Sequence, residues 1–429
     1  RDDAVGPASA SRGVMVVSAA LAGLALALGL AAAFLALDGN RVAGLTRTDL
    51  ALVALATAIT IVVGGFQAVL NGQKRLRDLA WLNSAAAFTG TAAAVAACVY
   101  SPANAVHAAF LFPLLASTVA VAVTARRLRW GPRLGAPRAG RALGVMLPTG
   151  LAVALGAVAA TATQFAARQI IVLHGSLSLA GEFQAAFSIS SVYLGVILSG
   201  LAGEYYPRIS AIVEEPTEVA RAVRGELVLV LLLSTPVIAL MMAVGPALIT
   251  LLYSAKFTAA FSVLAWQLVG DVFRVSGWVF ATSLLAAGAN RNYFGMELLW
   301  NALYIVALPL LWPAFGFVLT GALYAPCYVI YAGVGFFLVQ RRFGRLLDAR
   351  TGLVFLWCAL AVLASYLSLS LSPWSFGLLV RLAVAAVSGA ASAGLLFSQR
   401  TRTLFLPVAA GSWPPGLAGE SAEGRRLRE

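Results

Sequence analysis

The sequence predicts an all-α, multi-pass membrane protein with about twelve transmembrane helices. Hydrophobic residues make up 61% of the 429 residues and charged residues only 11%, whereas about 25% are charged in an ordinary soluble domain. Apolar runs of about 20 residues, enough to cross a bilayer, recur along the whole chain. Basic residues gather between these runs, so the net charge of +13 indicates membrane orientation and not nucleic-acid binding.

Each apolar run gives one expected span. The first run carries no charge and is rich in Ala, Leu and Gly, and the fifth and sixth form a hairpin that turns at Gly175. The seventh is expected to end at Gly245-Pro246, because proline disfavours a continuing helix. A short apolar piece up to Lys256 would then lie near the outer surface. The expected spans are 13–37, 50–70, 79–99, 105–125, 142–172, 179–205, 224–243, 257–287, 293–313, 316–339, 351–371 and 376–398.

Basic residues fall mainly on one side of these spans. With the N-terminus inside, 24 of the 30 Lys and Arg residues lie in inside segments. The positive-inside rule then places both termini and the basic segment 126–141 in the cytoplasm. Arg381 is expected to reach the outer surface along its own span. The other basic residues are Arg41, Arg47 and Lys256 outside, and Arg168 and Arg274 within spans.

Two short similarities indicate an internal repeat. The segment at 70–75, Leu-Asn-Gly-Gln-Lys-Arg, resembles 286–291, Ala-Ala-Gly-Ala-Asn-Arg, and the segments 108–113 and 321–326 both end in proline. Members of each pair are six spans apart, which predicts two parallel bundles related by an axis along the membrane normal. Chance similarity between Ala- and Leu-rich helices is the alternative. The expected division is a four-span first lobe, a basic cytoplasmic linker, a six-span second lobe, two appended spans and a cytoplasmic tail: 1–125, 126–141, 142–340, 351–398 and 399–429.

The hairpin at Gly175 carries a charge in each arm. Arg168 and Glu182 lie seven residues on either side of the turn, so we expect them at the same depth, forming an ion pair or sharing a water. Gln164 and Arg168 share one helix face with Thr161. A charge within a span usually faces a cavity or a partner. The hairpin is therefore a candidate wall of a polar cavity.

A second polar face lies in span 257–287. Gln267, Asp271 and Arg274 are spaced i, i+4, i+7 and share that face. The Asp–Arg pair has two interpretations: it neutralises itself and fixes helix packing, or it lines a cavity that binds a polar head group or a coupling ion. Glu204 and Glu297 are expected near the inner surface. Tryptophans are expected in the interfacial belt or in packing: Trp81, Trp266, Trp278, Trp300 and Trp312.

Five segments carry a resemblance to a known family: 180–194, 205–210, 251–260, 266–271 and 276–280. They resemble O-antigen translocases, which are lipid-linked oligosaccharide flippases of the multidrug/oligosaccharidyl-lipid/polysaccharide exporter superfamily. The resemblance is closest to the type that serves enterobacterial common antigen, or lipid III. It implies two six-helix lobes plus two appended helices. The chain, which begins at Arg1, would then lack the first two helices.

The resemblance implies a flippase that moves an undecaprenyl-pyrophosphate-linked oligosaccharide, such as an O-antigen unit, across the bacterial inner membrane by alternating access. Arg168 and Arg274 would attract the pyrophosphate, and Asp271 would orient Arg274. Glu182 would partner Arg168. The expected partners are membrane lipid, the lipid-linked glycan, a polysaccharide polymerase and a chain-length regulator, with Na⁺ or H⁺ as an unassigned coupling ion and no other cofactor. The remaining cavity candidates, expected to meet sugar hydroxyls or line the cavity, are Gln164, Gln184, Tyr193 and Gln267.

Two other functions fit a polytopic chain. A drug or metabolite exporter of the same superfamily would need an acidic cavity, whereas the deep acidic residues here are matched by arginines. A membrane polysaccharide polymerase or ligase would carry its chemistry on a large outer loop, and the expected outer segments are short. Three cysteines and two histidines lie singly, in no metal-binding or catalytic spacing. We therefore expect a transporter and not an enzyme.

Overall fold

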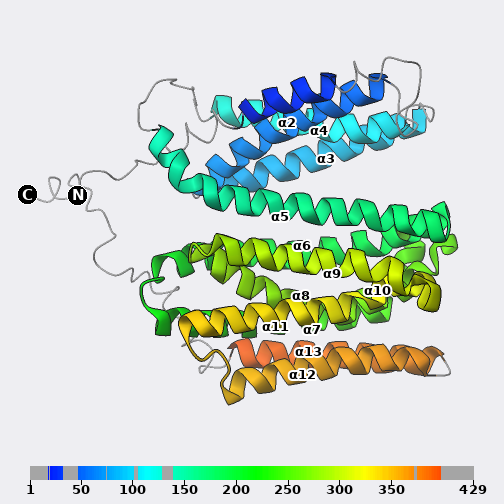
Figure 1. The fold of residues 1–429 in the computed structure, drawn as a ribbon. Helices are drawn as coiled ribbons and strands as arrows, with labels where there is room; N and C mark the ends of the chain where they lie inside the picture. The colour runs from blue at the N-terminus through cyan, green and yellow to red at the C-terminus, as the bar shows by residue number, and fades with distance from the viewer. Residues whose placement is uncertain are drawn as a thin grey trace, which may run out of the picture. The chain divides into compact units, whose positions relative to one another are not determined.

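The computed structural model is all-helical, as predicted (Figure 1). It describes residue 18 and the ranges 20–31, 47–73, 75–100, 105–127, 139–371 and 374–397. Twelve α-helices, α2 to α13, follow the helical segment 20–31 within these residues. Nine stretches of the described chain are long and apolar enough to cross a membrane. The helices correspond in order to the expected spans, although the tenth is divided by a break between α10 (Leu319–Ala322) and α11 (Tyr324–Phe343).

The chain divides into two compact units, residues 1–147 and 148–429. The first unit contains α2 (Arg47–Gly72), α3 (Leu76–Tyr100) and α4 (Ala105–Arg127). A small core of Phe66, Leu70 and Leu82 holds them together. Helices α3 and α4 approach closely because Gly90 faces Pro113, where an added Cβ would lie 2.6 Å from the proline Cα. The finer division predicted from the sequence stays a prediction, and 128–138 and 398–429 lie outside the described residues.

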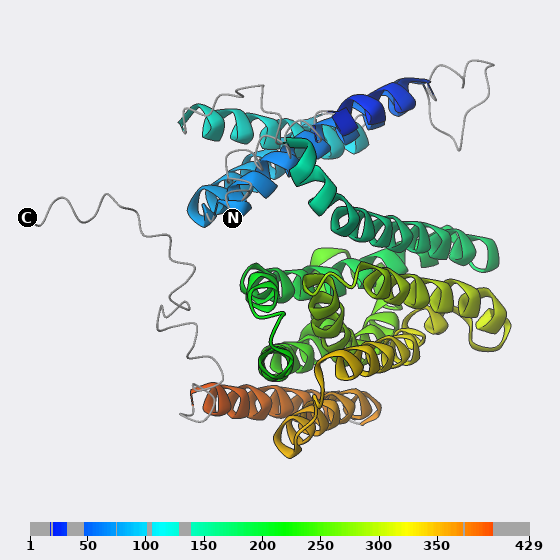
Figure 2. The ribbon, with the colours of Figure 1, turned by 60° about the vertical axis from the view of Figure 1, so that its left-hand side comes forward.

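Helix α8 (Ala260–Ala286) is the centre of the second unit, packed against neighbouring helices (Figures 1 and 2). It runs parallel to α11, and glycines let the two backbones approach. A Cβ added at Gly270 would lie 2.9 Å from Tyr324 atoms, and one added at Gly277 would lie 2.3 Å from the Tyr331 ring. The other long helices of this unit are α5 (Ala139–His174, which begins in the first unit), α6 (Leu177–Ala211), α7 (Pro216–Leu252), α9 (Asn290–Phe315), α12 (Ala349–Leu367) and α13 (Trp374–Phe397).

Helix α7 corrects one prediction, because it continues through Gly245-Pro246 to Leu252. Proline is tolerated within membrane helices, where neighbouring groups can satisfy the backbone. Gly245 faces the Phe261 ring of α8, where an added Cβ would meet Cε2 at 2.7 Å. The chain leaves the helix only after Leu252 and enters the short 3₁₀ helix Ala255–Phe257.

Arg381 on α13 corrects a second prediction. It does not extend toward solvent but is completely buried. Its Nη1 donates to the Ser368 carbonyl at 3.2 Å, where α12 ends in the 3₁₀ helix Ser368–Ser370. Carbonyls at a helix end lack intrahelical donors, so a neighbouring cation stabilises them. Arg381 thus links the two appended helices, which pack against α7.

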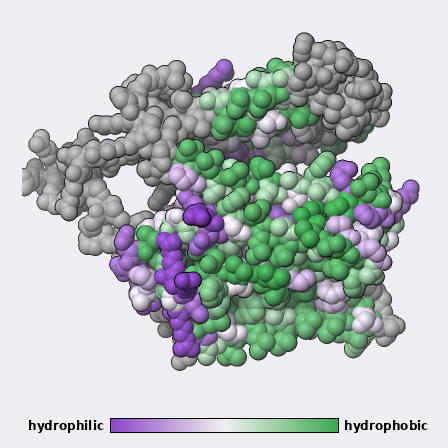
Figure 3. Space-filling view, viewed as in Figure 1, coloured by the Kyte–Doolittle hydropathy of each residue, from purple (hydrophilic) through white to green (hydrophobic). Residues whose placement is uncertain are grey.

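Hydrophilic side chains gather at one end of the second unit, around the α6–α7 connection and the end of α11 (Figure 3). Apolar side chains cover the middle of the visible face. Arg208 and Glu226 form an ion pair at this end, with Arg208 Nη2 2.7 Å from Glu226 Oε2. Glu204 lies 3.9 Å from Arg208 and its side chain is exposed, in agreement with the position expected near a surface. The cytoplasmic orientation of this end stays a prediction.

Candidate functional site

Polar side chains within the second unit gather around Asp271 on α8, which is completely buried. Two hydroxyls of α6 donate to its Oδ2: Ser190 Oγ at 3.1 Å, and the hydroxyl of Tyr193. These residues are three positions apart, so one face of α6 presents both donors. A buried carboxylate needs such donors, because each lone pair left without one raises the cost of burial.

Arg274 completes this arrangement from the next turn of α8. Its Nη1 lies 3.5 Å from Asp271 Oδ1. Its Cζ lies 5.7 Å from the centre of the Tyr328 ring on α11, close enough for a cation–π interaction. The carboxylate and the ring together fix the guanidinium, so both charges of the pair are engaged. This is the geometry required for a pair that fixes helix packing.

Gln164 and Arg168 of α5 lie near a different part of α11. Both lie near Tyr324, whose buried hydroxyl has no hydrogen-bond partner within the described residues. Within the described residues, Arg168 makes no ion pair or hydrogen bond, and its Nε is buried without a partner. Gln267 is completely buried, and neither of its amide atoms has a partner in the described part of the chain. Buried polar atoms without partners in the described chain thus occur on three helices of this unit: Gln164 and Arg168 on α5, Gln267 on α8 and Tyr324 on α11.

The predicted direct ion pair between Arg168 and Glu182 is absent from the described residues, where Glu182 Oε2 is buried without a partner. The reason is that α5 packs beside α9 instead of following α6. Thr149 Oγ1 lies 3.3 Å from Asn290 Oδ1 at one end, and the rings of His174 and Trp312 lie 5.9 Å apart at the other. The equal depth of the two residues stays a prediction.

Gln184 is also separate from the Asp271 cluster. Its Nε2 donates to Ser188 Oγ at 2.9 Å within α6. Of the eight predicted site residues, the structure joins Tyr193, Asp271 and Arg274 directly. It places Gln164 and Arg168 together beside Tyr324, and Gln267 one turn before Asp271.

Sequence reasoning missed the aromatic face of α11. Tyr324, Tyr328 and Tyr331 follow an i, i+4, i+7 spacing, which a search for aromatic periodicity would have found. Trp300 of α9 stacks on Tyr304 at a centroid distance of 5.4 Å and also contacts Tyr324 and Tyr328. Trp300 is thus a packing residue, one of the two roles expected for it.

Glu297, about two turns from the start of α9, is partly buried and contacts two neighbouring helices. Tyr331 donates its hydroxyl to Glu297 Oε1 at 2.7 Å. Helix α5 packs directly over this side chain, since a Cβ added at Gly156 would lie 3.2 Å from Glu297 Cγ. Its side chain keeps part of its surface exposed, and its location near the inner surface stays a prediction.

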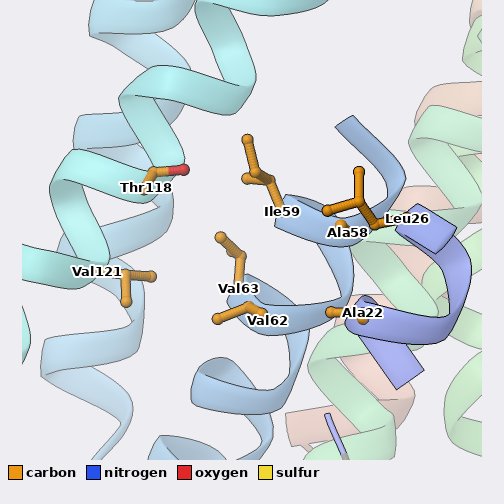
Figure 4. A pocket seen from close by; sticks show the side chains of 9 residues that line it. Ala22, Leu26, Ala58, Ile59, Val62, Val63, Thr118 and Val121 are labelled. Atoms are coloured by element: carbon orange, nitrogen blue, oxygen red, sulfur yellow. The ribbon is translucent and has the colours of Figure 1, made fainter. Parts of the chain in front are cut away.

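The first unit presents apolar grooves instead of a polar site. One of about 270 Å³ lies between segment 20–31, α2 and α4, with Leu26, Ile59 and Val121 among its lining residues (Figure 4). A second, of about 460 Å³, lies between α3 and α4. Neither has a charged residue in its lining. The candidate site is therefore the polar cluster of the second unit.

Comparison with known families identifies the chain's relatives. Residues 15–262, more than half of the chain, match the family described as polysaccharide biosynthesis protein. The chain belongs to this family. Lipid III flippases of Escherichia coli (strain K12) and Shigella flexneri are 31% identical over 177 residues, which cover 41% of this chain and 42% of theirs. The match thus spans less than half the length of these relatives.

Solved structures show the same fold. The lipid II flippase MurJ in an inward closed conformation aligns over 90% of this chain and 84% of its own, with a TM-score of 0.63 and 12% identity. A MOP superfamily transporter from Pyrococcus furiosus aligns over 78% and 80%, with a TM-score of 0.59 and 15% identity. An outward-facing multidrug resistance MATE transporter aligns over 79% and 84%, with a TM-score of 0.55 and 16% identity. The chain has the all-helical fold of these proteins, as the sequence predicted.

Proposed function

We propose that this protein is a flippase for an undecaprenyl-pyrophosphate-linked oligosaccharide, an O-antigen or related surface glycan unit, in the bacterial inner membrane. Membership of the polysaccharide biosynthesis family supports this assignment, as does the similarity to proteins named lipid III flippase. The observation that carries it is Arg168, a cation within a span that no carboxylate of the described residues neutralises.

Arg168 suits the charged part of this cargo. A pyrophosphate cannot enter hydrocarbon unless its charge is compensated, and arginine offers a permanently charged, forked donor for phosphate oxygens. Gln164 lies on the same face of α5, and Gln267 presents a buried amide without partners in the described chain. These two amides would bind sugar hydroxyls.

The two arginines take different roles in this proposal. Arg274 already interacts with Asp271 and Tyr328. It would therefore contribute positive electrostatic potential and shape to the site more than a free hydrogen-bond donor. Tyr193 holds Asp271 and is a positioning residue. Because Arg274 neutralises Asp271, the arrangement does not favour a cation exporter. A polysaccharide polymerase and a chain-length regulator remain the proposed protein partners.

Transport in proteoliposomes tests the proposal. The protein is reconstituted with a fluorescent undecaprenyl-pyrophosphate oligosaccharide, and a membrane-impermeant glycosidase reports which leaflet holds the glycan. Arg168→Ala should abolish movement, and Arg168→Lys should restore only part of it, because the bidentate geometry is lost. Arg221→Ala is the matched control, since this exposed arginine pairs with Glu218 and with no other carboxylate of the described residues. Normal transport by Arg168→Ala at a normal protein level would show that another cation binds the pyrophosphate.

A further inference from the structure

Two carboxylates on neighbouring helices of the second unit, Asp271 and Glu297, have different electrostatic environments. Asp271 has a guanidinium and two hydroxyl donors. Glu297 has one neutral donor, Tyr331, and no ion pair within the described residues. A carboxylate in a membrane span that lacks a countercharge is costly to keep ionised, and it lowers this cost by taking up a proton.

The groups that face Glu297 do not neutralise it. Tyr331 and Tyr328 come from α11 and Tyr293 from α9, and all three are uncharged at neutral pH. Arg274 of α8 is the cation that acts on Glu297 electrostatically, but it forms its ion pair with Asp271. Helix α5 contributes Gly156, which carries no charge.

A second observation points to a ligand at the same place. Asn301 lies one turn further along α9 and is 3% exposed, and its Oδ1 has no hydrogen-bond partner in the described chain. Its Nδ2 donates to the Glu297 carbonyl at 2.8 Å, which keeps the amide beside this turn. Buried polar atoms without protein partners usually bind internal water. Water on Asn301 would give a proton a route to the carboxylate.

We propose that Glu297 is a proton-binding site. Oε1 accepts the Tyr331 hydroxyl, so the proton resides on Oε2. Binding forms one O–H bond, removes one negative charge and needs no other reactant. Glu182, in the second turn of α6, also lacks an ion pair in the described residues, and its buried Oε2 has no partner there. It is a second acid whose contribution to the same measurement a Glu182→Gln variant would separate.

The position of Glu297 links this proton to helix α5. Gly156 packs against the Glu297 stem, and the same helix carries Gln164 and Arg168. A neutral Glu297 allows α5 to lie against α9, whereas an ionised one draws water into that contact. Proton release would thus loosen the helix that carries the proposed pyrophosphate ligand. The proton site itself does not depend on the identity of the cargo.

Infrared spectroscopy of the protein in lipid bilayers tests this without transport. An ordinary glutamate, with a pKa of about 4.3, is ionised at pH 7, so a neutral carboxyl band at that pH reports a protected acid. Glu297→Gln should remove one carboxyl from this band, and Glu297→Asp should shift the band without removing it. Glu204→Gln should leave it unchanged, because the Glu204 side chain is 60% exposed.

Three results would overturn the proposal. The first is a neutral carboxyl band that Glu297→Gln leaves unchanged. The second is a band that Glu204→Gln removes equally. The third is loss of the Glu297 component on addition of Na⁺ at constant pH, which would make the site one for a metal cation. Thermal unfolding of each variant confirms that it is folded, and Glu297→Asp keeps the test valid if Glu297→Gln does not fold.

Discussion

Arg274 and Asp271 lie one turn apart on α8, with the arginine Nη1 3.5 Å from the aspartate Oδ1. Asp271 is completely buried, while the Arg274 side chain keeps 24% of its surface exposed. The pair is therefore asymmetric: the carboxylate depends on its neighbours, and the guanidinium retains access to a ligand or to water.

This asymmetry predicts the outcome of a double-mutant cycle. Asp271→Asn leaves Arg274 without a countercharge and should destabilise the protein by about 3 kcal/mol, the lower end of the range for a broken buried pair. Arg274→Met should cost at least as much, because it leaves the buried carboxylate. The double variant should recover most of the loss, as measured by unfolding in lipid or detergent. Additive losses would show that the two side chains do not interact.

The two hydroxyls on Asp271 should be partly redundant. Tyr193→Phe or Ser190→Ala each removes one donor from Oδ2 and leaves the other, so each should cost about 1 kcal/mol. The double variant should cost more than the sum, because Oδ2 then has no donor from α6. The same unfolding measurement checks this. A single variant that costs as much as the double would mean that only one of the hydroxyls holds the carboxylate.

The sequence predicted the helices well because length and hydropathy decide whether a segment can cross a membrane. It was wrong at Gly245-Pro246, through which α7 continues to Leu252 while Gly245 packs against Phe261 of α8. It was also wrong at Arg381, whose acceptor is a carbonyl that only the fold brings near. Both errors depend on tertiary contacts, to which local patterns are not sensitive.

At the candidate site, too, local patterns predicted what helix geometry determines and missed what tertiary packing determines. Helical spacing correctly placed Gln267, Asp271 and Arg274 on one face, since the period of a helix is fixed. The equal sequence distance of Arg168 and Glu182 from the Gly175 turn did not predict the partner of Arg168. Whether α6 or α9 lies beside α5 depends on packing. The hydrogen bond between Glu297 and Tyr331 spans 34 residues and has no local signal.

Asp348 predicts a pH dependence at the start of α12. The backbone N–H of Thr351 donates to its Oδ1 at 2.7 Å and holds the pKa of Asp348 below its ordinary value. A depressed folded-state pKa means that this stabilisation is complete above the unfolded value of about 3.9 and is lost as pH falls through the folded value.

The corresponding test compares two substitutions. Asp348→Ala should weaken the first turn of α12 by about 1 kcal/mol at pH 7, whereas Asp348→Asn, also a capping residue, should cost less. Hydrogen exchange of the Thr351 amide measures both. The difference between Asp348 and the alanine variant should shrink below about pH 4. A difference that stays constant down to pH 2 would mean that the charged form of Asp348 does not provide the cap.

Labelling of the two ends of the second unit tests the predicted orientation. Leu177 begins α6 at one end and Glu214 lies in the α6–α7 connection at the other, and both are exposed. The native cysteines Cys98, Cys327 and Cys358 are first replaced by alanine. Because basic residues gather at the end that holds Glu214, the positive-inside rule places this end in the cytoplasm. A cysteine at Leu177 should therefore react with an impermeant maleimide in intact cells, and one at Glu214 should react only after the membrane is opened. The reverse pattern would invert the whole topology, because a continuous helix, α6, joins the two positions.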